Sequence, residues 1–535
     1  MSTFDYSRRH SSEAAIGNVV IGYGHPIAVQ SMTNTPTLDT DASVAQIERI
    51  AEAGADIVRL TAQSVNHARN LANIKAEAVR RGCDVPLVAD IHFTPDAAMV
   101  AAEVVEKVRI NPGNFVDPAR TFRHLEYTDA EYADELARIE NRLTPLLDLC
   151  KSRGVALRIG VNHGSLSDRI MSRYGNTPAG MVESAMEFLR IARAHDFNNV
   201  VISIKASNVT VMVETVRLLA SAMKAEGMAY PLHLGVTEAG DGEDGRIKSA
   251  VGIGSLLAEG IGDTIRVSLS EAPEAEPPVA RKLVEYVGRM AEADPIEGEM
   301  APGYNPVAPE RRKVECDILP CPYPVIGLDI QSGELHDGVA VISSDSKNYP
   351  GHAKAQMHRM LAEGDSRPAI LKVSYPASMA FDDVVLAASV DLGAVLLSGF
   401  GDGLWIDAPH LPQDKLNSLA LGILQAARLR ISKTEYIACP SCGRTLFDLP
   451  AALAQVRAAT AHLPGLKIAM MGCIVNGPGE MADADYGYVG AGVGNVSLYK
   501  GKQLVHKNLP ADQALPLLIQ LIKDNGDWKD APSQD

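Results

Sequence analysis

The cysteines near the C-terminus are the residues of this sequence whose spacing points most directly to chemistry. Cys439 and Cys442 form a C-x-x-C pair, and Cys473 follows 31 residues after Cys442. Thiolates at such spacing bind zinc or an iron–sulfur cluster. A structural zinc site needs four closed ligands, and Cys316 and Cys321 could complete one. The local spacing alone leaves both kinds of site open.

A carboxylate follows the third cysteine at a position that matters if the metal is iron. Three thiolates leave one iron of a [4Fe–4S] cube without a sulfur ligand, and that iron can take a carboxylate or a substrate oxygen. Glu480 lies seven residues after Cys473, directly behind a Gly-Pro-Gly segment that turns the chain sharply. A carboxylate is a weaker ligand to that iron than a thiolate, so it can leave and return. The stretch from Cys439 to Glu480 is therefore the candidate metal-binding region of the chain.

Upstream of the cysteines, short β-rich runs alternate with longer helical runs from residue 27 to 270. Eight strands are predicted, namely Ile27–Met32, Ile57–Thr61, Leu87–Ile91, Lys107–Ile110, Ala156–Val161, Val200–Lys205, Leu232–Thr237 and Thr264–Leu269. Eight β/α units over about 250 residues predict an α/β fold of the (β/α)8 TIM-barrel type. A doubly wound open sheet is the alternative, but no G-x-G-x-x-G fingerprint follows the first strand.

Polar residues end nearly every predicted strand, which is where barrel enzymes carry their catalytic residues. Five cations occupy such positions and should converge on one mouth, namely Arg59, Arg109, Arg158, Lys205 and Arg266. In a chain of net charge −16, this convergence predicts an anionic ligand, and guanidinium forks suit phosphate oxygens. A single arginine could be a surface ion pair, but five equivalent positions make that reading weak. His92 could instead form a buried pair with Asp90, and Glu238 could balance a nearby cation.

Two further regions separate the predicted barrel from the cysteines. Residues 115–150 form a long polar connection with a helical pattern, which we place on the barrel exterior. A linker rich in Pro, Glu and Ala, with one helix expected at Val279–Met290, covers residues 271–312, and residues 313–430 read as a separate α/β unit. We therefore predict a barrel domain over 1–292, an inserted α/β domain over 293–430 and a C-terminal α+β iron–sulfur domain over 431–535.

The insert contains an internal echo of the barrel. Residues 392–406 align without gaps with residues 253–267, which lie 139 positions earlier. We infer that the insert is a degenerate, half-barrel-like copy of the last barrel units, with chance similarity between glycine-rich helix–strand joints as the alternative. Trp405 stands in the copy where Arg266 stands in the barrel, so the anion-binding residue is lost and we expect a structural role.

The composition excludes several classes of protein. The chain has 535 residues, of which 46% are hydrophobic, and its net charge of −16 argues against a general nucleic-acid binder. No apolar run reaches the length of a membrane span, and the first residues contain no secretory signal. The seven cysteines do not show the spacing of a disulfide scaffold. The sequence thus predicts a cytoplasmic enzyme without membrane or nucleic-acid partners.

In these motifs the chain resembles the 4-hydroxy-3-methylbut-2-enyl diphosphate synthase family, which acts at the penultimate step of the methylerythritol phosphate route to isoprenoids. The resemblance rests on residues 26–35, 88–93, 109–114, 158–162, 232–240, 262–269, 438–442 and 472–480. The 115–150 extension and the 313–430 insert depart from the common two-domain form. They look like the three-domain form of plants and some bacteria.

The resemblance implies an iron–sulfur oxidoreductase that reductively opens 2-C-methyl-D-erythritol 2,4-cyclodiphosphate. It implies a [4Fe–4S] cluster held by Cys439, Cys442, Cys473 and Glu480. It also implies that the substrate is bound by Arg59, Arg109, Arg158, Asn162, Lys205, Arg266 and Ser268. Glu238 and His92 are then candidates for proton delivery. The sequence shows no flavin or nicotinamide site, so we expect ferredoxin or flavodoxin as electron donor, and a homodimer.

Two other functions and one question of assembly stay open. A non-redox phosphosugar-binding barrel with a zinc-ribbon interaction domain would bind zinc and lack a visible chromophore. A pterin-binding barrel also binds anionic groups at this rim, but it does not require Glu480. The insert could be a rigid spacer that carries the cluster domain back over its own barrel mouth. Alternatively, a spacer of this size could preserve a site shared between two chains.

Overall fold

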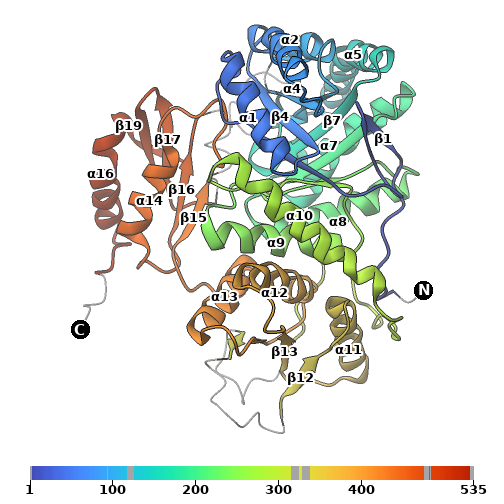
Figure 1. Ribbon diagram of the computed structural model, residues 1–535, viewed down its shortest axis with the longest axis vertical. Helices are drawn as coiled ribbons and strands as arrows, with labels where there is room; N and C mark the ends of the chain where they lie inside the picture. Colours follow the sequence, from blue (N-terminus) through green and yellow to red (C-terminus); the bar gives the residue numbers. More distant parts are fainter. Residues whose placement is uncertain are drawn as a thin grey trace.

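The computed structural model describes residues 3–92, 94–116, 126–314, 324–327, 338–474, 481 and 483–530. Its strands form a two-stranded hairpin, an eight-stranded sheet, a four-stranded sheet and a five-stranded sheet. Figure 1 shows the eight-stranded part in blue to green, the insert in yellow to orange below it, and the C-terminal part in orange to red beside it. No described helix combines the length and the apolar character that a membrane span requires.

The eight-stranded sheet is the predicted barrel. Its parallel strands are β3 (Ala28–Met32), β4 (Ile57–Ala62), β5 (Leu87–Ile91), β6 (Lys107–Ile110), β7 (Ala156–Asn162), β8 (Val200–Lys205), β9 (His233–Leu234) and β10 (Thr264–Ile265). A parallel bridge between Ile202 and Leu232 joins β8 to β9 and closes the ring. The last two strands are shorter than predicted. After β9 the chain turns through Glu238 and Gly240, which both have positive φ.

Helices cover the outside of the barrel. They are α1 (Thr40–Glu52), α2 (Val65–Arg80), α3 (Pro95–Ala102), α4 (Pro112–Phe115), α5 (Asp129–Arg153), α6 (Asp168–Tyr174), α7 (Pro178–Ala194), α8 (Val209–Ala225), α9 (Gly242–Ala258) and α10 (Glu276–Gly288), with short 3-10 turns at His163–Ser165, Pro273–Ala275 and Arg289–Glu292. The helix predicted in the 115–150 connection is α5, which starts at a capping box of Thr128 and Glu131.

A small hairpin closes the N-terminal end of the barrel, where the parallel strands begin. It consists of β1 (Ala14–Ile16) and β2 (Val19–Ile21), whose buried Ile16 and Ile21 pack against residues from the N-terminal ends of the barrel strands. The polar strand ends therefore form a mouth at the opposite, C-terminal end of the barrel.

The insert is an α/β unit, as predicted. Its parallel strands are β11 (Val325–Ile326), β12 (Ala340–Ser343), β13 (Ala369–Ser374) and β14 (Gly403–Asp407), in the order β11-β14-β13-β12. Its helices are α11 (Tyr349–Glu363), α12 (Phe381–Leu396) and α13 (Gln413–Ala426). The two aligned segments, 253–267 and 392–406, both run from a helix into a parallel strand.

Helices α9 and α12 cross at positions that the internal echo makes equivalent. A Cβ added to Gly254 would lie 2.5 Å from Val390, and one added to Gly393 would lie 3.1 Å from Val251. The 139-residue offset pairs Gly254 with Gly393 and Val251 with Val390, so the contact is nearly symmetrical. The glycines let the two helices approach closely, which fixes the insert against the barrel.

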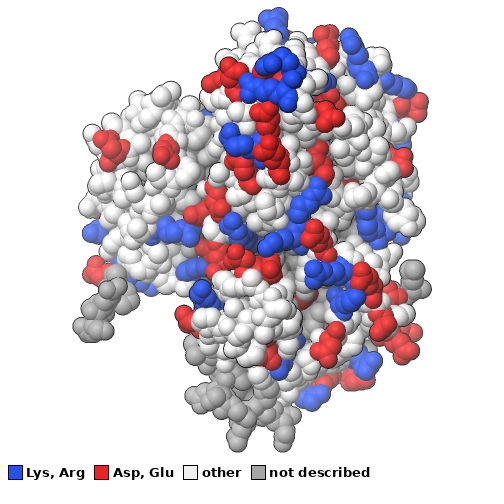
Figure 2. All heavy atoms as spheres, in the orientation of Figure 1, with Lys and Arg blue, Asp and Glu red and all other residues white. Residues whose placement is uncertain are grey.

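Charged side chains of both signs gather along the junction of the barrel and the insert, as Figure 2 shows. Lys282 of α10 pairs with Asp383 of α12 at 2.6 Å across this junction. Deeper in the contact, Lys354 of α11 donates to Glu259 at 3.0 Å, and Arg217 of α8 pairs with the same carboxylate at 2.5 Å. Polar pairs thus add to the apolar helix crossing.

The C-terminal part is a mixed sheet with helices. Its strands are β15 (Glu435–Ala438), β16 (Lys467–Met471), β17 (Tyr486–Gly492), β18 (Asn495–Lys500) and β19 (Gln503–Pro510), and its helices are α14 (Leu449–Thr460) and α16 (Ala511–Asp524). The first three strands are parallel and the last three antiparallel. The glycine-rich run 490–494 forms the β17–β18 hairpin, as predicted.

This C-terminal part docks on the barrel mouth of its own chain. Ala239, behind β9, forms a parallel bridge with Ala438 at the end of β15. Ser270 Oγ donates to the carbonyl oxygens of Ala438 and Cys439, each at 3.1 Å. Lys248 of α9 donates to Glu435 at 3.0 Å in a pair that is largely buried. A single chain therefore contributes both sides of the space between barrel and cysteines.

Candidate active site

A cavity of about 70 Å³ lies between the barrel mouth and the C-x-x-C loop. Every residue expected to bind the substrate lines it, together with both proton-donor candidates and two of the three cysteines, namely Arg59, Arg109, Arg158, Asn162, Lys205, Arg266, Ser268, His92, Glu238, Cys439 and Cys442. Cys473 is not among the lining residues. Glu480 lies outside the described residues, as do Cys316 and Cys321 of the zinc alternative.

The cations of the mouth are buried with little compensating negative charge. Arg158 is 1% exposed, and its Nε and Nη1 have no hydrogen-bond partner among the described residues. Burial, and then the neighbouring Arg59 guanidinium, lower the pKa of Arg158 and of Lys205 well below their ordinary values. Burial also lowers the pKa of Arg59 to about 10. Because uncompensated buried charge is costly, this arrangement favours an anion.

Arg109 is held in place by acceptors. Its Nη1 donates to Asp90 at 2.9 Å, and its Nη2 donates to the Gly160 carbonyl at 2.9 Å and to Asn162 Oδ1 at 3.0 Å. Burial, and then Arg109, lower the pKa of His92 to about 3, so its imidazole is neutral, and its Nε2 contacts Arg109 Nη1. Burial raises the pKa of Asp90, but Arg109, Arg59 and His92 together outweigh it and hold that pKa well below its usual range.

Arg266 is fixed by a carboxylate that the sequence analysis missed. Its Nε and Nη2 donate to the two oxygens of Glu276 at 3.0 and 2.8 Å, in a pair that is almost fully buried. Glu276 also accepts from Ser31 Oγ at 2.7 Å and from the Leu269 amide at 3.2 Å. Glu276 opens α10 within the stretch that the sequence analysis read as a linker, so no sequence signal marked it.

Lys107 is a further buried cation, two residues before Arg109 on β6. The sequence did not single it out either. It is fully buried on β6, and its amine has no hydrogen-bond partner in the described parts of the chain. Burial, and then Arg158, lower the pKa of Lys107 well below its ordinary value. The available signal was its spacing, because side chains two residues apart on a strand share a face. Lys107 instead opens its strand, whereas the predicted site residues were taken from strand ends.

Glu238 lies in the turn after β9 and is 6% exposed. Its φ is 48°, a conformation that non-glycine residues rarely adopt. Such strain concentrates at functional sites. The turn brings this carboxylate to the same cavity as Cys439, whose thiol pKa it helps to raise.

The three cysteine thiols are electrostatic neighbours. Burial raises the pKa of the Cys439 thiol, and the nearby Cys442, Glu238 and Cys473 raise it further. Ser441, with a φ of 64°, turns the loop between the first two cysteines. Thiolates that repel one another in a buried place fit a cationic metal group. No three described His, Cys, Asp or Glu side chains surround a single ion, and the thiolates of a cluster need not, since each binds its own iron.

Arg444 is a third residue that the sequence analysis missed. It follows the C-x-x-C loop, is 9% exposed in its side chain, and has Nη2 3.7 Å from Asp90 Oδ2. Burial lowers the pKa of Arg444, but Cys442 and Asp90 outweigh it and raise that pKa. Arg444 therefore links the cysteine loop to the carboxylate that also holds Arg109.

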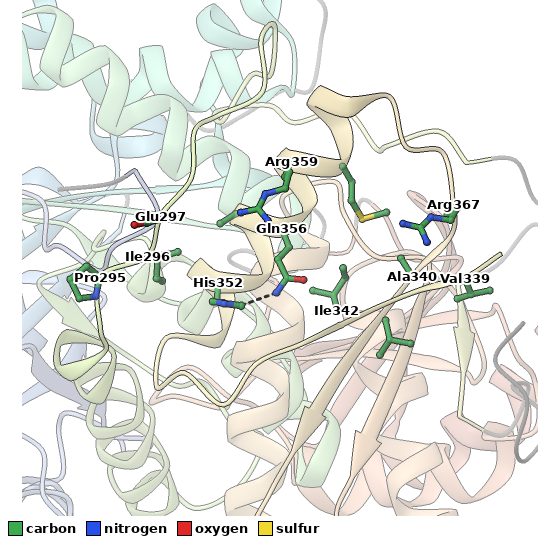
Figure 3. A pocket seen from close by; sticks show the side chains of 13 residues that line it. Pro295, Ile296, Glu297, Val339, Ala340, Ile342, His352, Gln356, Arg359 and Arg367 are labelled. Carbon is green, nitrogen blue, oxygen red and sulfur yellow. Dashed lines mark hydrogen bonds between the residues drawn. The ribbon is translucent and has the colours of Figure 1, made fainter. Parts of the chain in front are cut away.

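A larger cavity lies elsewhere, in the insert. It measures about 610 Å³ and is lined by α11, β12 and residues 295–297. Figure 3 shows His352 and Gln356 joined by a hydrogen bond of 2.9 Å on α11, with Arg359 farther along that helix and Arg367 before β13. None of its described lining side chains is a buried polar group without a partner. The chemistry is concentrated at the smaller cavity of the barrel mouth.

Comparison with known proteins identifies the family. Residues 11–281 match the model described as the GcpE TIM-barrel domain, and residues 435–524 match the model of the GcpE protein C-terminal domain. A relative in Parabacteroides distasonis is 50% identical over 99% of this chain and 100% of its own length. One in Bacteroides fragilis is 49% identical over 100% and 98%. Both are named 4-hydroxy-3-methylbut-2-en-1-yl diphosphate synthase (flavodoxin).

A plant protein is similar over the full chain as well. The chloroplastic protein of Oryza sativa subsp. japonica named 4-hydroxy-3-methylbut-2-en-1-yl diphosphate synthase (ferredoxin) is 38% identical over 100% of this chain and 89% of its own length. The similarity thus spans barrel, insert and C-terminal part together. The chain belongs to the GcpE family, the family of the 4-hydroxy-3-methylbut-2-enyl diphosphate synthases.

Proposed function

We propose that this protein opens 2-C-methyl-D-erythritol 2,4-cyclodiphosphate reductively and releases 4-hydroxy-3-methylbut-2-enyl diphosphate and water. Its family, and the names of relatives similar over their whole length, support this reaction. The observation that carries the proposal is the composition of one cavity. Buried cations with too few anions share it with the side chains of Cys439 and Cys442.

The cysteines fit the iron–sulfur group that the family implies. Cys439, Cys442 and Cys473 would hold it through their sulfurs, and Glu480 would complete the ligand set. When bound, a [4Fe–4S] cluster would pass on, one at a time, the two electrons that the protein donor provides, and would supply a Lewis-acidic iron for breaking a C–O bond. The mutual repulsion of the three neighbouring thiols in their charged form supports this assignment.

The cations of the mouth would bind and orient the diphosphate. Arg158 has two nitrogens without a partner among the described residues, and Lys205 is buried among other cations, so phosphate oxygens are their natural partners. Asp90 and Glu276 hold the side chains of Arg109 and Arg266 in place before the substrate binds. Binding therefore does not have to order two long side chains, and its entropic cost is lower. Preset donors stabilise the negative charge that grows on the diphosphate as the ring opens. Asn162 and Ser268 would add neutral hydrogen bonds.

Glu238 is the better placed of the two proton-donor candidates. It lines the cavity beside Cys439 and can hold a proton near the C–O bond that breaks. His92 is neutral and its Nε2 faces Arg109, so we assign it a positioning role for that guanidinium. A proton delivered by Glu238 would leave with the departing hydroxyl as water.

We further propose that one chain holds a complete site. Ser270 and Lys248 anchor the C-terminal part to the barrel of the same chain. The cavity of about 70 Å³ is smaller than usual ligand pockets, which span roughly 300–1,000 Å³. Substrate entry therefore requires the C-terminal part to swing away, with Ile431–Glu435 as the hinge. A homodimer would then contain two independent sites.

The test is anaerobic purification followed by turnover. The protein should be brown, contain about four irons per chain, and form the linear diphosphate when supplied with the cyclic substrate and reduced flavodoxin or ferredoxin. Cys473→Ser should lose the colour and the activity. Bound zinc without a visible chromophore or turnover would overturn the proposal in favour of the non-redox barrel. Full iron content in anaerobically reconstituted Cys473→Ser would refute the ligand assignment.

A further inference from the structure

Arg444 is the cation that the C-terminal part presents to the barrel mouth. Among the described residues that line the mouth cavity, residues 439–442 and Arg444 come from that part of the chain, and Arg444 is the only cation among them. The arginines and the lysine on the other side of the cavity all belong to the barrel. Arg444 can therefore reach a ligand in the mouth only from the side of the cysteines.

Gly443 seats the cysteine loop closely on the barrel, just before Arg444. A Cβ added to Gly443 would lie 2.7 Å from the carbonyl oxygen of Thr35 and 2.8 Å from Thr61 Oγ1. The Gly443 carbonyl also accepts from Gln63 Nε2 at 3.3 Å. Because a residue with a side chain could not approach the backbone of Thr35 so closely, glycine is needed here. The seated loop carries the following residue, Arg444, into the mouth.

The guanidinium of Arg444 is buried without a carboxylate of its own. Its side chain is 9% exposed, and its Nη2 lies 3.7 Å from Asp90 Oδ2, which is too far for a hydrogen bond. That carboxylate already accepts from Arg109 Nη1 at 2.9 Å. The Nε of Arg444 is buried and has no hydrogen-bond partner among the described residues. This donor is therefore available to an anion in the cavity.

Docking of the C-terminal part also brings like charges together. Burial, and then repulsion from Arg266, Arg109 and Arg444, lower the pKa of Arg59 against the attraction of Asp90. Two walls that both carry cations repel each other unless an anion lies between them. A diphosphate in the mouth would attract both walls, and it would thereby favour the docked arrangement.

We propose that Arg444 is a substrate-binding residue, which holds the diphosphate from the cysteine side while the barrel cations hold it from the other. This inference rests on the proposed function, because the ligand it requires is the cyclic diphosphate. Substrate then stabilises the docked arrangement, since one anion contacts both parts of the chain. The docking contact of Lys248 with Glu435 lies outside the described lining of the cavity and does not depend on the substrate.

Calorimetric titration with the cyclic diphosphate tests the contact. The anaerobically purified protein is used in its oxidised form, so that the substrate is bound but not consumed. Arg444→Met should raise the Kd roughly tenfold or more, as expected for removing one partner of a desolvated charge pair. Arg444→Lys should raise it less, because it keeps the charge but loses the guanidinium fork. Lys248→Met weakens docking from outside the cavity, and as the matched control it should raise the Kd less than Arg444→Met.

Hydrogen–deuterium exchange measures docking itself. Saturating cyclic diphosphate should slow the exchange of the amides around the bridge between Ala239 and Ala438 in the unaltered protein. In Arg444→Met this slowing should be largely lost even at saturation, because the substrate then contacts the barrel alone.

Several outcomes would overturn the inference. They are an equal Kd in Arg444→Met and the unaltered protein, full slowing of exchange in saturated Arg444→Met, and a rise of the Kd in Lys248→Met as large as that in Arg444→Met. If Arg444→Met loses its irons, its Kd is compared with that of Cys473→Ser, which keeps Arg444, and equal values would also overturn the inference. An unaltered protein that does not bind the cyclic diphosphate, or does not convert it with reduced flavodoxin, would instead refute the proposed function.

Discussion

Arg158 and Arg266 lie in the same mouth but should respond differently to the same substitution. Arg266 is paired with Glu276 through two hydrogen bonds, and both side chains are at most 4% exposed. Arg158 has two nitrogens without a partner among the described residues. Arg266→Met therefore leaves a buried carboxylate unpaired, whereas Arg158→Met removes a charge that the fold does not compensate.

The structure gives the size of each effect. Removing one partner of a buried ion pair costs about 3–5 kcal/mol, and about 1 kcal/mol shifts the Tm of a domain this large by roughly 2–4 °C. We expect Arg266→Met to lower the Tm by roughly 6–20 °C, and Arg158→Met to leave it unchanged or raise it. Both variants should lose about 2–5 kcal/mol of binding free energy for the cyclic diphosphate, because each removes a desolvated partner of a phosphate.

Differential scanning calorimetry and isothermal titration calorimetry of the anaerobic protein measure the two quantities. The double variant Arg266→Met/Glu276→Leu also removes the unpaired carboxylate. It should therefore recover most of the lost Tm, but none of the affinity for the cyclic diphosphate. A Tm loss in Arg158→Met as large as that in Arg266→Met would contradict the reading of Arg158 as uncompensated. Unchanged affinity in either variant would remove that residue from the binding site.

Three further outcomes are expected. Lys107→Met should raise the Tm, because it replaces a buried amine that has no hydrogen-bond partner among the described residues by an apolar side chain, and a lower Tm would refute that. The carboxyl of Asp391 accepts from the Tyr286 hydroxyl at 2.6 Å, and burial raises its pKa to about 7, so its contribution to stability is full at low pH and is lost as the pH rises towards 7. The Tm advantage of Asp391→Asn should therefore grow between pH 5 and 8 in thermal scans, and a flat difference would contradict the assignment. Lys248→Met breaks a charged hydrogen bond of about 1.5–3 kcal/mol to Glu435, so turnover should fall roughly tenfold at unchanged iron content, and unaltered turnover would show that this pair does not support docking.

The sequence predicted the structure well where apolar and polar residues recur at a regular spacing. Alternating strands and helices predicted all eight barrel strands, because each strand is a short buried run with a polar end. The mouth could be predicted from the same pattern, since parallel strands bring their C-terminal ends together. Arg59, Arg109 and Arg158 thus reach one cavity from β4, β6 and β7.

The missed residues act across the fold and not along the chain. Glu276 meets Arg266 from the first turn of α10, just before the start of the helix expected in the linker, and Arg444 meets Asp90 only when the C-terminal part docks. The spacing of Lys107 and Arg109 on one strand was visible in the sequence. Whether Lys107 is a buried cation without a partner depends on how few carboxylates the barrel interior contains, which the sequence does not show. The closeness of α9 and α12 also needed the structure, because the echo between 253–267 and 392–406 does not show that the two copies touch.

The central claim is that each chain carries its own complete reaction site, and complementation tests it most directly. Arg158→Met, with a defective mouth, and Cys473→Ser, with a defective cysteine set, are mixed, dissociated and reassociated under anaerobic conditions. Turnover of the mixture is compared with that of each parent. A site within one chain predicts that the mixture stays as inactive as its parents. Recovery of activity well above either parent would show that mouth and cysteines come from different chains and would contradict the claim.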